Sequence, residues 1–248
     1  MKEFYINDDG IRLHCKLDMP VEETDKCPLV IVIHGLTGDM EEPHITAIAE
    51  RMNQLGFATL RAEMYGHGKS EGRFEDHNMF KWILNGLKVI DYARSLDFVT
   101  DLYLVGHSQG GLLTVLLGGL RNNQFKAILP LSPAMLIPEG ARNGEMLGMK
   151  FDPDNIPDVI SIPKYNLNGD YMRVAQLIHA EDAVRKYHGK VFIVHGDEDE
   201  AIPLHYSEEL QKMYDDCELV VTHGDDHCYN RHLDQVLEAI TEFLKKQK

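Results

Sequence analysis

Short runs of consecutive apolar residues recur along the chain, and segments with the apolar spacing of a helix separate them. Such runs are typical of parallel strands that are buried on both faces of a sheet. Strands that alternate with helices predict a mostly parallel sheet with helices on both faces. The expected strands are 29–33, 58–61, 102–105, 127–131, 191–194 and 218–221, and the expected helices are approximately 43–54, 78–94, 110–120 and 233–246.

The segment near the N-terminus has a different pattern. Ile11, Leu13, Cys15 and Leu17 alternate with polar residues. A period of two indicates a half-buried strand, because successive side chains point to opposite faces of the sheet. We expect this strand to be antiparallel and near an edge of the sheet.

One long stretch interrupts the alternation of strands and helices. Between Ser132 and about Asp182 there is no buried-strand run, and the stretch holds five prolines. A loop of that length is uncommon in a compact domain unless it has a function. We therefore predict a single domain over 1–248, with residues of about 133–182 inserted as a cap over the carboxyl edge of the sheet.

Composition limits the classes of partner. The chain has 248 residues, with 25 Lys and Arg against 40 Asp and Glu, which gives a formal charge of −15. An anionic protein is repelled by nucleic acid and by anionic membranes, so neither is expected as a partner. The charge fits a neutral small molecule or simply a solvated surface. The sequence leaves open whether the chain forms a homodimer.

The N-terminal residues and the cysteines predict a cytoplasmic protein. Residues 1–10 contain no apolar core of the kind found in a signal peptide, and no apolar run approaches the roughly 20 residues that a membrane span requires. The four cysteines form no Cys-x-x-Cys pair, so we expect free thiols in a reducing compartment.

A candidate nucleophile lies between the expected strand 102–105 and the helix that follows it. Residues 106–110 read Gly-His-Ser-Gln-Gly, which fits the pattern G-x-S-x-G. The pattern alone is common, but the strand–turn–helix context is the one that a nucleophile elbow needs. The flanking glycines permit a sharp turn, and the turn raises Ser108 above the edge of the sheet. We predict Ser108 as the nucleophile.

An oxyanion hole requires two hydrogen-bond donors. The backbone amide of Gln109, directly after the nucleophile, is one. The second is expected in the loop His34-Gly35-Leu36-Thr37-Gly38, which follows the strand 29–33 directly. We choose the amide of Leu36, and the side chain of Thr37 remains an alternative.

The acid and the base of such a site follow the serine in chain order. Four acidic residues lie at 197–200, just beyond the strand 191–194, and we choose Asp199, with Asp197 as the alternative. His227 lies in the loop between the last strand and the last helix, where it can reach the same edge of the sheet. We predict His227 as the base. The spacing of the histidines at 223, 227 and 232 fits no metal-site pattern, so no metal is expected.

These motifs resemble those of the α/β-hydrolases, and most of all those of the bacterial feruloyl (cinnamoyl) esterases. The resemblance covers nearly the whole chain. It rests on the stretches 34–38, 65–70, 106–111, 195–203 and 224–227, and the stretches 74–77, 131–134 and 151–154 look specific to the esterase group.

The resemblance implies an α/β-hydrolase fold, the triad Ser108, Asp199 and His227, oxyanion donors at Leu36 and Gln109, and no cofactor. In the family pattern the acid is the third residue after the glycine, which favours Asp199 over Asp197. The chain departs from expectation in its cap: its one tryptophan, Trp82, lies on a predicted core helix. Phe151, Tyr165 and Tyr171 are therefore the expected cap residues for an aromatic acyl group.

Together these features predict a serine esterase that acts through an acyl-enzyme on a small-molecule ester, with hydroxycinnamate esters as the expected substrates. A general short-chain carboxylesterase is the alternative within the same class. A ligand-binding sensor with a slow triad is the alternative from a different class. A lipase that acts at interfaces is disfavoured, because the cap is highly charged.

Overall fold

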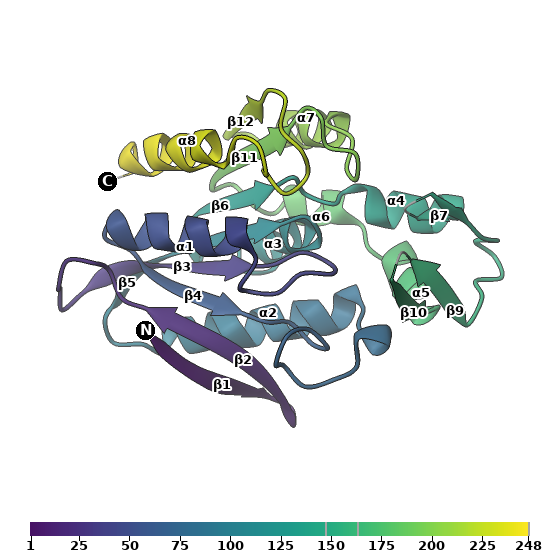
Figure 1. Ribbon diagram of the computed structural model, residues 1–248, viewed down its shortest axis with the longest axis horizontal. Coiled ribbons are helices and arrows are strands. Elements are labelled where there is room, and N and C mark those ends of the chain that lie inside the picture. The colour runs from purple at the N-terminus through teal and green to yellow at the C-terminus, as the bar shows by residue number, and fades with distance from the viewer. Residues whose placement is uncertain (147, 163, 248) are drawn as a thin grey trace.

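The apolar runs form the centre of one eight-stranded sheet, as the computed structural model of the chain shows (Figure 1). The structure describes residues 1–146, 148–162 and 164–247, so positions 147 and 163 of the predicted cap lie outside the described residues. The strand order in the sheet is β1-β2-β4-β3-β5-β6-β11-β12. The strands are β1 (Lys2–Asp8), β2 (Ile11–Asp18), β3 (Cys27–Ile33), β4 (Ala58–Ala62), β5 (Val99–His107), β6 (Phe125–Leu131), β11 (Lys190–Gly196) and β12 (Cys217–Thr222).

The pairing of the strands confirms the predicted mostly parallel α/β-hydrolase sheet. Six neighbouring strands, from β4 through β3, β5, β6 and β11 to β12, are parallel to one another. β2 is antiparallel to both of its neighbours, β1 and β4, as its alternating pattern predicted. The carboxyl ends of the parallel strands meet at one edge of the sheet, which is where an α/β fold places its ligand.

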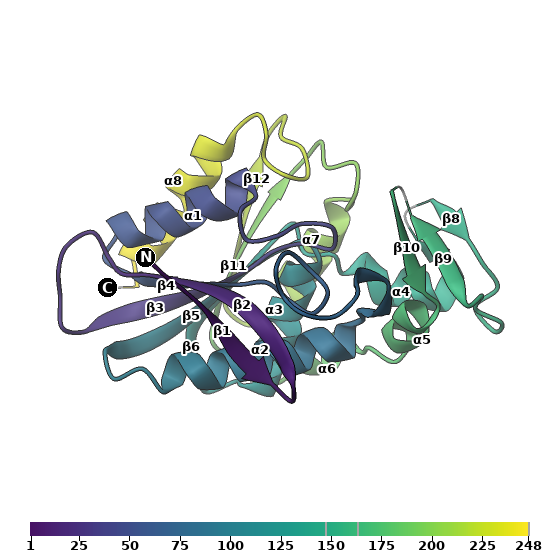
Figure 2. The same cartoon turned by 60° about the horizontal axis from the view of Figure 1, so that its bottom comes forward.

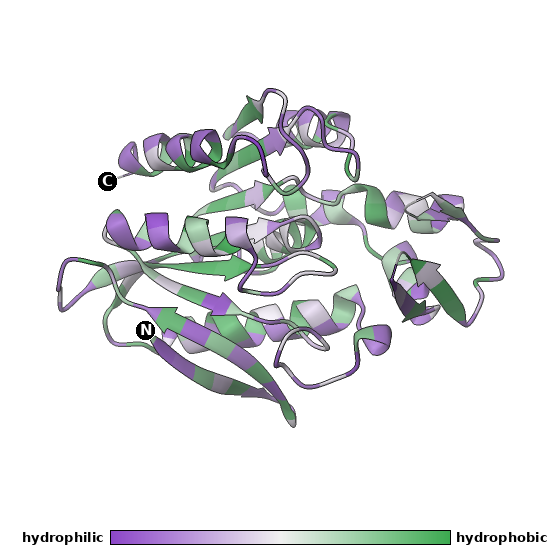
Figure 3. Cartoon of the chain, in the orientation of Figure 1, coloured by the Kyte–Doolittle hydropathy of each residue, from purple (hydrophilic) through white to green (hydrophobic). Residues whose placement is uncertain are grey.

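Helices cover both faces of the sheet (Figure 2). α1 and α8 pack on the face formed by Val30, Val32 and the residues in register with them. α2, α3, α6 and α7 pack on the opposite face, against Leu29, Ile31 and their neighbours. Figure 3 shows the result, with apolar central strands and outer helices such as α8 that carry polar residues on one side. α3 is the exception, since its residues Gln109 to Gly119 are all buried. The helices of these layers are α1 (Pro43–Gln54), α2 (Met79–Arg94), α3 (Gln109–Leu120), α6 (Ala180–Val184), α7 (His205–Met213) and α8 (Leu233–Lys245).

Three elements of the main fold, β1, α6 and α7, were not predicted. β1 forms a hairpin with β2 through Asp9 and Gly10, whose φ angles of 49° and 86° are both positive. Asp-Gly between two strands is a strong signal for this type of turn, so the sequence contained the evidence for β1. α7 follows Pro203 and was also missed.

The segment between β6 and β11 folds into small elements of its own. Figure 1 shows most of them beyond the end at which the arrowheads of β3 and β4 point. The strands are two to four residues long and form two separate two-stranded sheets, too short to give an apolar run in the sequence. The elements before α6 are α4 (Leu136–Asn143), β7 (Glu145–Met146), β8 (Met149–Lys150), β9 (Val159–Ile162), β10 (Tyr165–Asn168) and α5 (Asp170–Gln176). A short 3₁₀ helix, η1 (Phe74–Asp76), precedes α2.

Within the described residues, no helix combines the length and the apolar character that a membrane crossing requires.

Candidate active site

Ser108 occupies a sharp turn between β5 and α3. Its φ angle is 56° and its ψ angle is −119°, a backbone conformation that L-residues rarely adopt. The turn brings α3 close to β3, and a Cβ atom added to Gly110 would collide with the backbone oxygen of His34. Glycine is therefore required at that position. Strained backbone at the nucleophile is the expected geometry of an elbow.

Asp199 and His227 come from the loops that follow β11 and β12, and they meet at the same edge of the sheet as Ser108. His227 Nδ1 lies 2.7 Å from Asp199 Oδ2. The other carboxylate oxygen, Oδ1, accepts hydrogen bonds from the backbone amides of Ala201 and Ile202 at 2.9 and 2.8 Å. The Asp199 side chain is fully buried and the His227 side chain is 22 % exposed. The carboxylate is therefore held rigidly, while the imidazole reaches the pocket.

Two histidines, rather than one, surround the Asp199 carboxylate. Burial alone raises the pKa of Asp199, but hydrogen bonds from His195 and His227 outweigh burial and hold the pKa well below its ordinary value. His195 Nε2 lies 3.2 Å from Asp199 Oδ2. Asp199 is thus an anion at neutral pH, as a group that orients an imidazole and stabilises its cation must be. The contact from His195 was not predicted.

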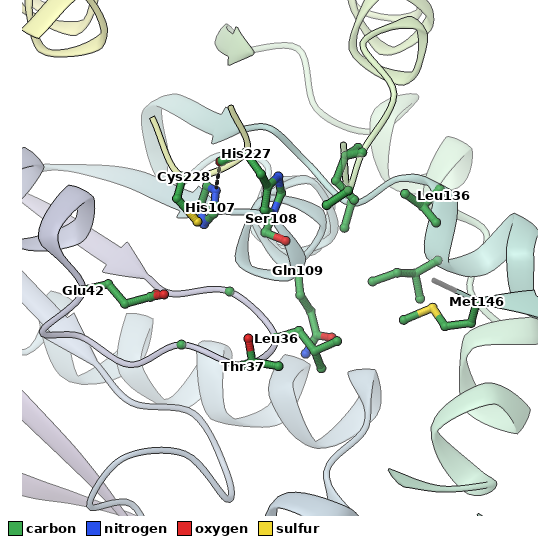
Figure 4. A pocket seen from close by; sticks show the side chains of 16 residues that line it. Leu36, Thr37, Glu42, His107, Ser108, Gln109, Leu136, Met146, His227 and Cys228 are labelled. Carbon is green, nitrogen blue, oxygen red and sulfur yellow. Dashed lines mark hydrogen bonds between the residues drawn. The ribbon is translucent and has the colours of Figure 1, made fainter. Parts of the chain in front are cut away.

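Ser108 and His227 line one pocket, and Figure 4 shows both side chains directed into it. His107, the residue before the nucleophile, links the two loops, because its Nε2 lies 2.8 Å from the backbone oxygen of His227. The sequence pattern predicted that Ser108, Asp199 and His227 would converge, and the structure brings the three side chains to one site.

The two predicted oxyanion donors flank the nucleophile. Neither the Leu36 amide nor the Gln109 amide donates to an acceptor in the described part of the chain, so both remain free for a ligand oxygen. Two buried histidines hold the Leu36 loop in place. His34 Nδ1 lies 2.8 Å from the Gly35 oxygen, and His67 Nε2 lies 2.5 Å from the Leu36 oxygen.

Burial keeps these two histidines neutral. Loss of solvent lowers the pKa of His34 to about 3 and also lowers the pKa of His67. His34 therefore serves as a neutral hydrogen-bonding group at neutral pH, and burial favours the neutral form of His67 as well.

The wall of the pocket is mostly apolar. Its residues come from the segment after β6 and from the loop after β11, and they are Ala134, Leu136, Ile137, Met146, Ala201 and Ile202. Ala134, Ala201 and Ile202 lie in the stretches 131–134 and 195–203, which carry the resemblance but were not assigned to the pocket, and no motif marks Leu136, Ile137 or Met146. Sequence reasoning therefore missed them.

The three aromatic residues expected to bind substrate lie outside the described lining of this pocket. Tyr171 is buried behind the pocket, where its hydroxyl donates to Gln109 Oε1 at 2.5 Å. Tyr165 is 41 % exposed and stacks on Phe74, with ring centroids 4.5 Å apart. Phe151 packs against the hydrophobic core and is absent from the described pocket lining. Aromatic character alone did not indicate which way each side chain points.

The alternative acid, Asp197, lies outside the pocket. Its carboxylate pairs with the exposed His223, with Asp197 Oδ2 2.7 Å from His223 Nδ1. Asp197 therefore has a partner of its own at the surface. The described residues hold no group of three or more His, Cys, Asp or Glu side chains arranged to bind a metal ion.

A strained serine at the elbow of a mostly parallel sheet, beside a buried aspartate–histidine pair, defines a serine hydrolase with the α/β-hydrolase fold. The family model described as "Serine aminopeptidase, S33" matches residues 24–160, more than half of the chain, and the chain belongs to that family. The match includes the nucleophile and the Leu36 loop and ends before Asp199 and His227.

Solved structures give a closer comparison. Est1E from Butyrivibrio proteoclasticus with ferulic acid bound is 55% identical to the chain, with 98% of each chain covered and a TM-score of 0.97. A second structure of Est1E is 52% identical, covers 100% of this chain and 99% of that one, and has a TM-score of 0.94. Among curated proteins, the mitochondrial palmitoyl-protein thioesterase ABHD10 of Pongo abelii is 26% identical over 82% of this chain and 67% of its own length. The chain is a serine esterase of the α/β-hydrolase superfamily.

Proposed function

We propose that the chain hydrolyses esters of hydroxycinnamic acids, such as feruloyl esters, through an acyl-enzyme on Ser108. One observation carries this proposal: Est1E, which is 55% identical over 98% of both chains, has been seen with ferulic acid bound. The apolar wall beside Ser108 supports the same conclusion, because a phenylpropenoyl group is flat and largely apolar.

Acylation begins when the Ser108 hydroxyl attacks the ester carbonyl carbon and His227 Nε2 accepts the hydroxyl proton. Asp199 accepts a hydrogen bond from His227 Nδ1, so the imidazole is held in the tautomer whose Nε2 has a free lone pair. The imidazolium that forms is stabilised by the Asp199 carboxylate. His227 then protonates the departing alcohol, and the ferulate remains bound to Ser108 as an ester.

The negative charge on the carbonyl oxygen is stabilised by the amides of Leu36 and Gln109. Their donors are fixed before the reaction by the backbone, so no reorganisation is needed when the charge develops. α3 begins at Gln109, and the positive end of its dipole favours the same charge. In the second half-reaction, His227 removes a proton from water, the water attacks the acyl carbon, and His227 returns the proton to Ser108 Oγ as its bond to the acyl group breaks and the acid is released.

The proposed roles are tested by Ser108→Ala. A fluorophosphonate probe should label the wild-type protein rapidly and fail to label the variant. Hydrolysis of methyl ferulate should fall by about a million-fold, since loss of the nucleophile removes the function of the whole triad. Substantial activity in Ser108→Ala would refute the nucleophile. Binding of ferulate by an unlabelled, inactive wild-type protein would indicate a sensor instead.

The acyl preference is tested separately by comparing methyl ferulate with methyl butyrate. We expect a higher kcat/KM for the ferulate, because the aliphatic wall covers its ring. A large preference for butyrate would indicate a short-chain carboxylesterase with the same catalytic residues.

A further inference from the structure

Glu42 brings a carboxyl group to the side of the pocket opposite the aliphatic wall. Leu136 and Met146 lie on one side of Ser108 in Figure 4, and Glu42 lies on the other, with its carboxylate directed toward the pocket. Neither the sequence motifs nor the mechanism above uses this residue. An ester bound at Ser108 therefore meets two chemically different ends of one pocket.

The Glu42 carboxyl has no hydrogen-bonding partner among the residues that the structure describes. Glu42 is the N-cap residue of α1, a position from which a side chain commonly accepts hydrogen bonds from the first turn of the helix, yet it makes no such bond. Its Oε2 atom is buried without a partner, and no donor in the described residues bonds to Oε1. Oε2 is covered against Gly38 and out of reach of a ligand, whereas Oε1 is not buried and is the acceptor that a bound molecule can reach. When a ligand displaces water from Oε1, a donor on the ligand replaces the hydrogen bond that is lost.

The position of the carboxyl is built into the loop that also carries the oxyanion donor. Glu42 packs directly on Gly38, where any Cβ atom would overlap the carboxylate. Burial, with Asp39 nearby, raises the pKa of Glu42 to about 7. The folded chain thus holds this carboxyl near Ser108 without neutralising it through a salt bridge.

The geometry of an ester determines what reaches Glu42. With the carbonyl carbon at Ser108 and the carbonyl oxygen at the Leu36 and Gln109 amides, the acyl group and the alcohol diverge toward opposite ends of the pocket. The aliphatic end suits an aromatic acyl group, so the alcohol points toward Glu42. This step rests on the function proposed above.

We propose that Glu42 accepts a hydrogen bond from a free hydroxyl on the alcohol portion of the substrate, so that the enzyme favours esters of sugars or other polyols over esters of simple alkyl alcohols. A polyol supplies the donor that the carboxyl lacks. A methyl or ethyl group supplies none and leaves the carboxyl unpaired.

The test compares two esters of one acid, methyl ferulate and glyceryl ferulate, in the wild type and in Glu42→Leu. At a pH above 8, where the Glu42 carboxyl is ionised, we expect the ratio of kcat/KM for glyceryl ferulate to that for methyl ferulate to fall by about 10- to 100-fold in the variant, the range for loss of a hydrogen bond to a charged group. Glu42→Gln keeps an acceptor but loses the charge, so its ratio should lie between those of the wild type and Glu42→Leu. Ratios within twofold of the wild type in both variants would overturn the proposal.

Two further measurements make the result specific. Glu41→Leu removes the neighbouring carboxylate, which is exposed and pairs with Lys16, and should leave the ratio unchanged. Both esters give the same feruloyl-enzyme, so the effect must appear in acylation and not in the rate of acyl-enzyme hydrolysis. An equal loss of kcat/KM on both esters would mean that Glu42 affects the reaction only through its charge. That result would overturn its role in selecting the alcohol.

The test of the alcohol preference and the test of the acyl class can fail separately. If the wild type prefers butyrate to ferulate, the proposed acyl class is wrong, and the same ratio is then measured with methyl and glyceryl butyrate.

Discussion

His107 holds the main chain of His227 through a hydrogen bond in which the direction of donation is fixed. A carbonyl oxygen can only accept, so the proton at the 2.8 Å contact belongs to His107 Nε2. His107 Nδ1 then carries the lone pair and accepts from His44 Nε2 at 3.1 Å. Burial lowers the pKa of His107 well below its usual value and that of His44 to about 4, so both rings are neutral near pH 7.

Replacing His107 by alanine should lower kcat for methyl ferulate by about 10- to 100-fold and change KM little. The reason is that the His227 carbonyl loses its buried donor, which costs about 1–3 kcal/mol when the partner is not replaced, and the proposed base is then less well positioned. Steady-state kinetics on the purified variant measure the effect. His107→Gln offers an amide donor and should recover part of kcat. Wild-type kcat in His107→Ala would refute the positioning role.

Asp199→Asn should lower kcat by about 10,000-fold at neutral pH, because an amide cannot both orient the imidazole and stabilise its cation. Asp197→Asn is the matched control, since Asp197 pairs with His223 at the surface. We expect its kcat to stay within about twofold of the wild type. If Asp197→Asn lowered kcat more than Asp199→Asn, Asp197 would be the acid instead of Asp199.

The stability of the protein in acid should depend on Asp199. Its pKa is lower in the folded chain than in the unfolded chain, so ionised Asp199 stabilises the fold above about pH 4, and this stabilisation is lost as the pH falls toward the folded value. Thermal unfolding between pH 2 and 6 should therefore show a steeper loss of Tm in the wild type than in Asp199→Asn. Parallel curves would show that the carboxylate contributes no pH-dependent stability.

Tyr171→Phe should destabilise the fold by about 1–3 kcal/mol, because the buried Gln109 side chain loses its hydroxyl donor. KM for methyl ferulate should change by less than about twofold, since Tyr171 lies behind the pocket. Denaturant unfolding and steady-state kinetics check the two parts. Met146→Ala provides the contrast: it removes part of the pocket wall and should raise KM. A large rise of KM in Tyr171→Phe would restore the original assignment of Tyr171 to substrate binding.

The central sheet could be predicted because burial on both faces leaves a simple trace in the sequence. In β3, Leu29 and Ile31 pack on one face while Val30 and Val32 pack on the other, so the run must be apolar throughout. The elbow around Ser108 could be predicted for a similar reason, because its backbone demands small residues at fixed positions.

The pocket wall and the polar end of the pocket could not be predicted. Leu136 and Met146 lie in short elements whose side-chain directions follow no long period, so the prediction for the cap relied on aromatic residue type and named Tyr171 instead. Glu42 and His195 were not predicted although their contacts are short in sequence: His195 lies four residues before Asp199, and Glu42 packs on Gly38 in its own loop. Such contacts depend on the path that each loop takes, which residue type alone does not specify.

The proposed catalytic side chains lie in loops at strand ends, whereas part of the pocket wall lies in the segment that follows β6. This separation affects how the enzyme can change by mutation. The groups that move protons are anchored at strand ends, while Leu136, Ile137 and Met146 belong to a separate stretch of chain. If this wall binds the acyl group as proposed, mutations there can change the acid that the enzyme accepts while the proton-transfer groups keep their positions. Exchange of this stretch between relatives is a direct route to new ester specificities on an unaltered reaction centre.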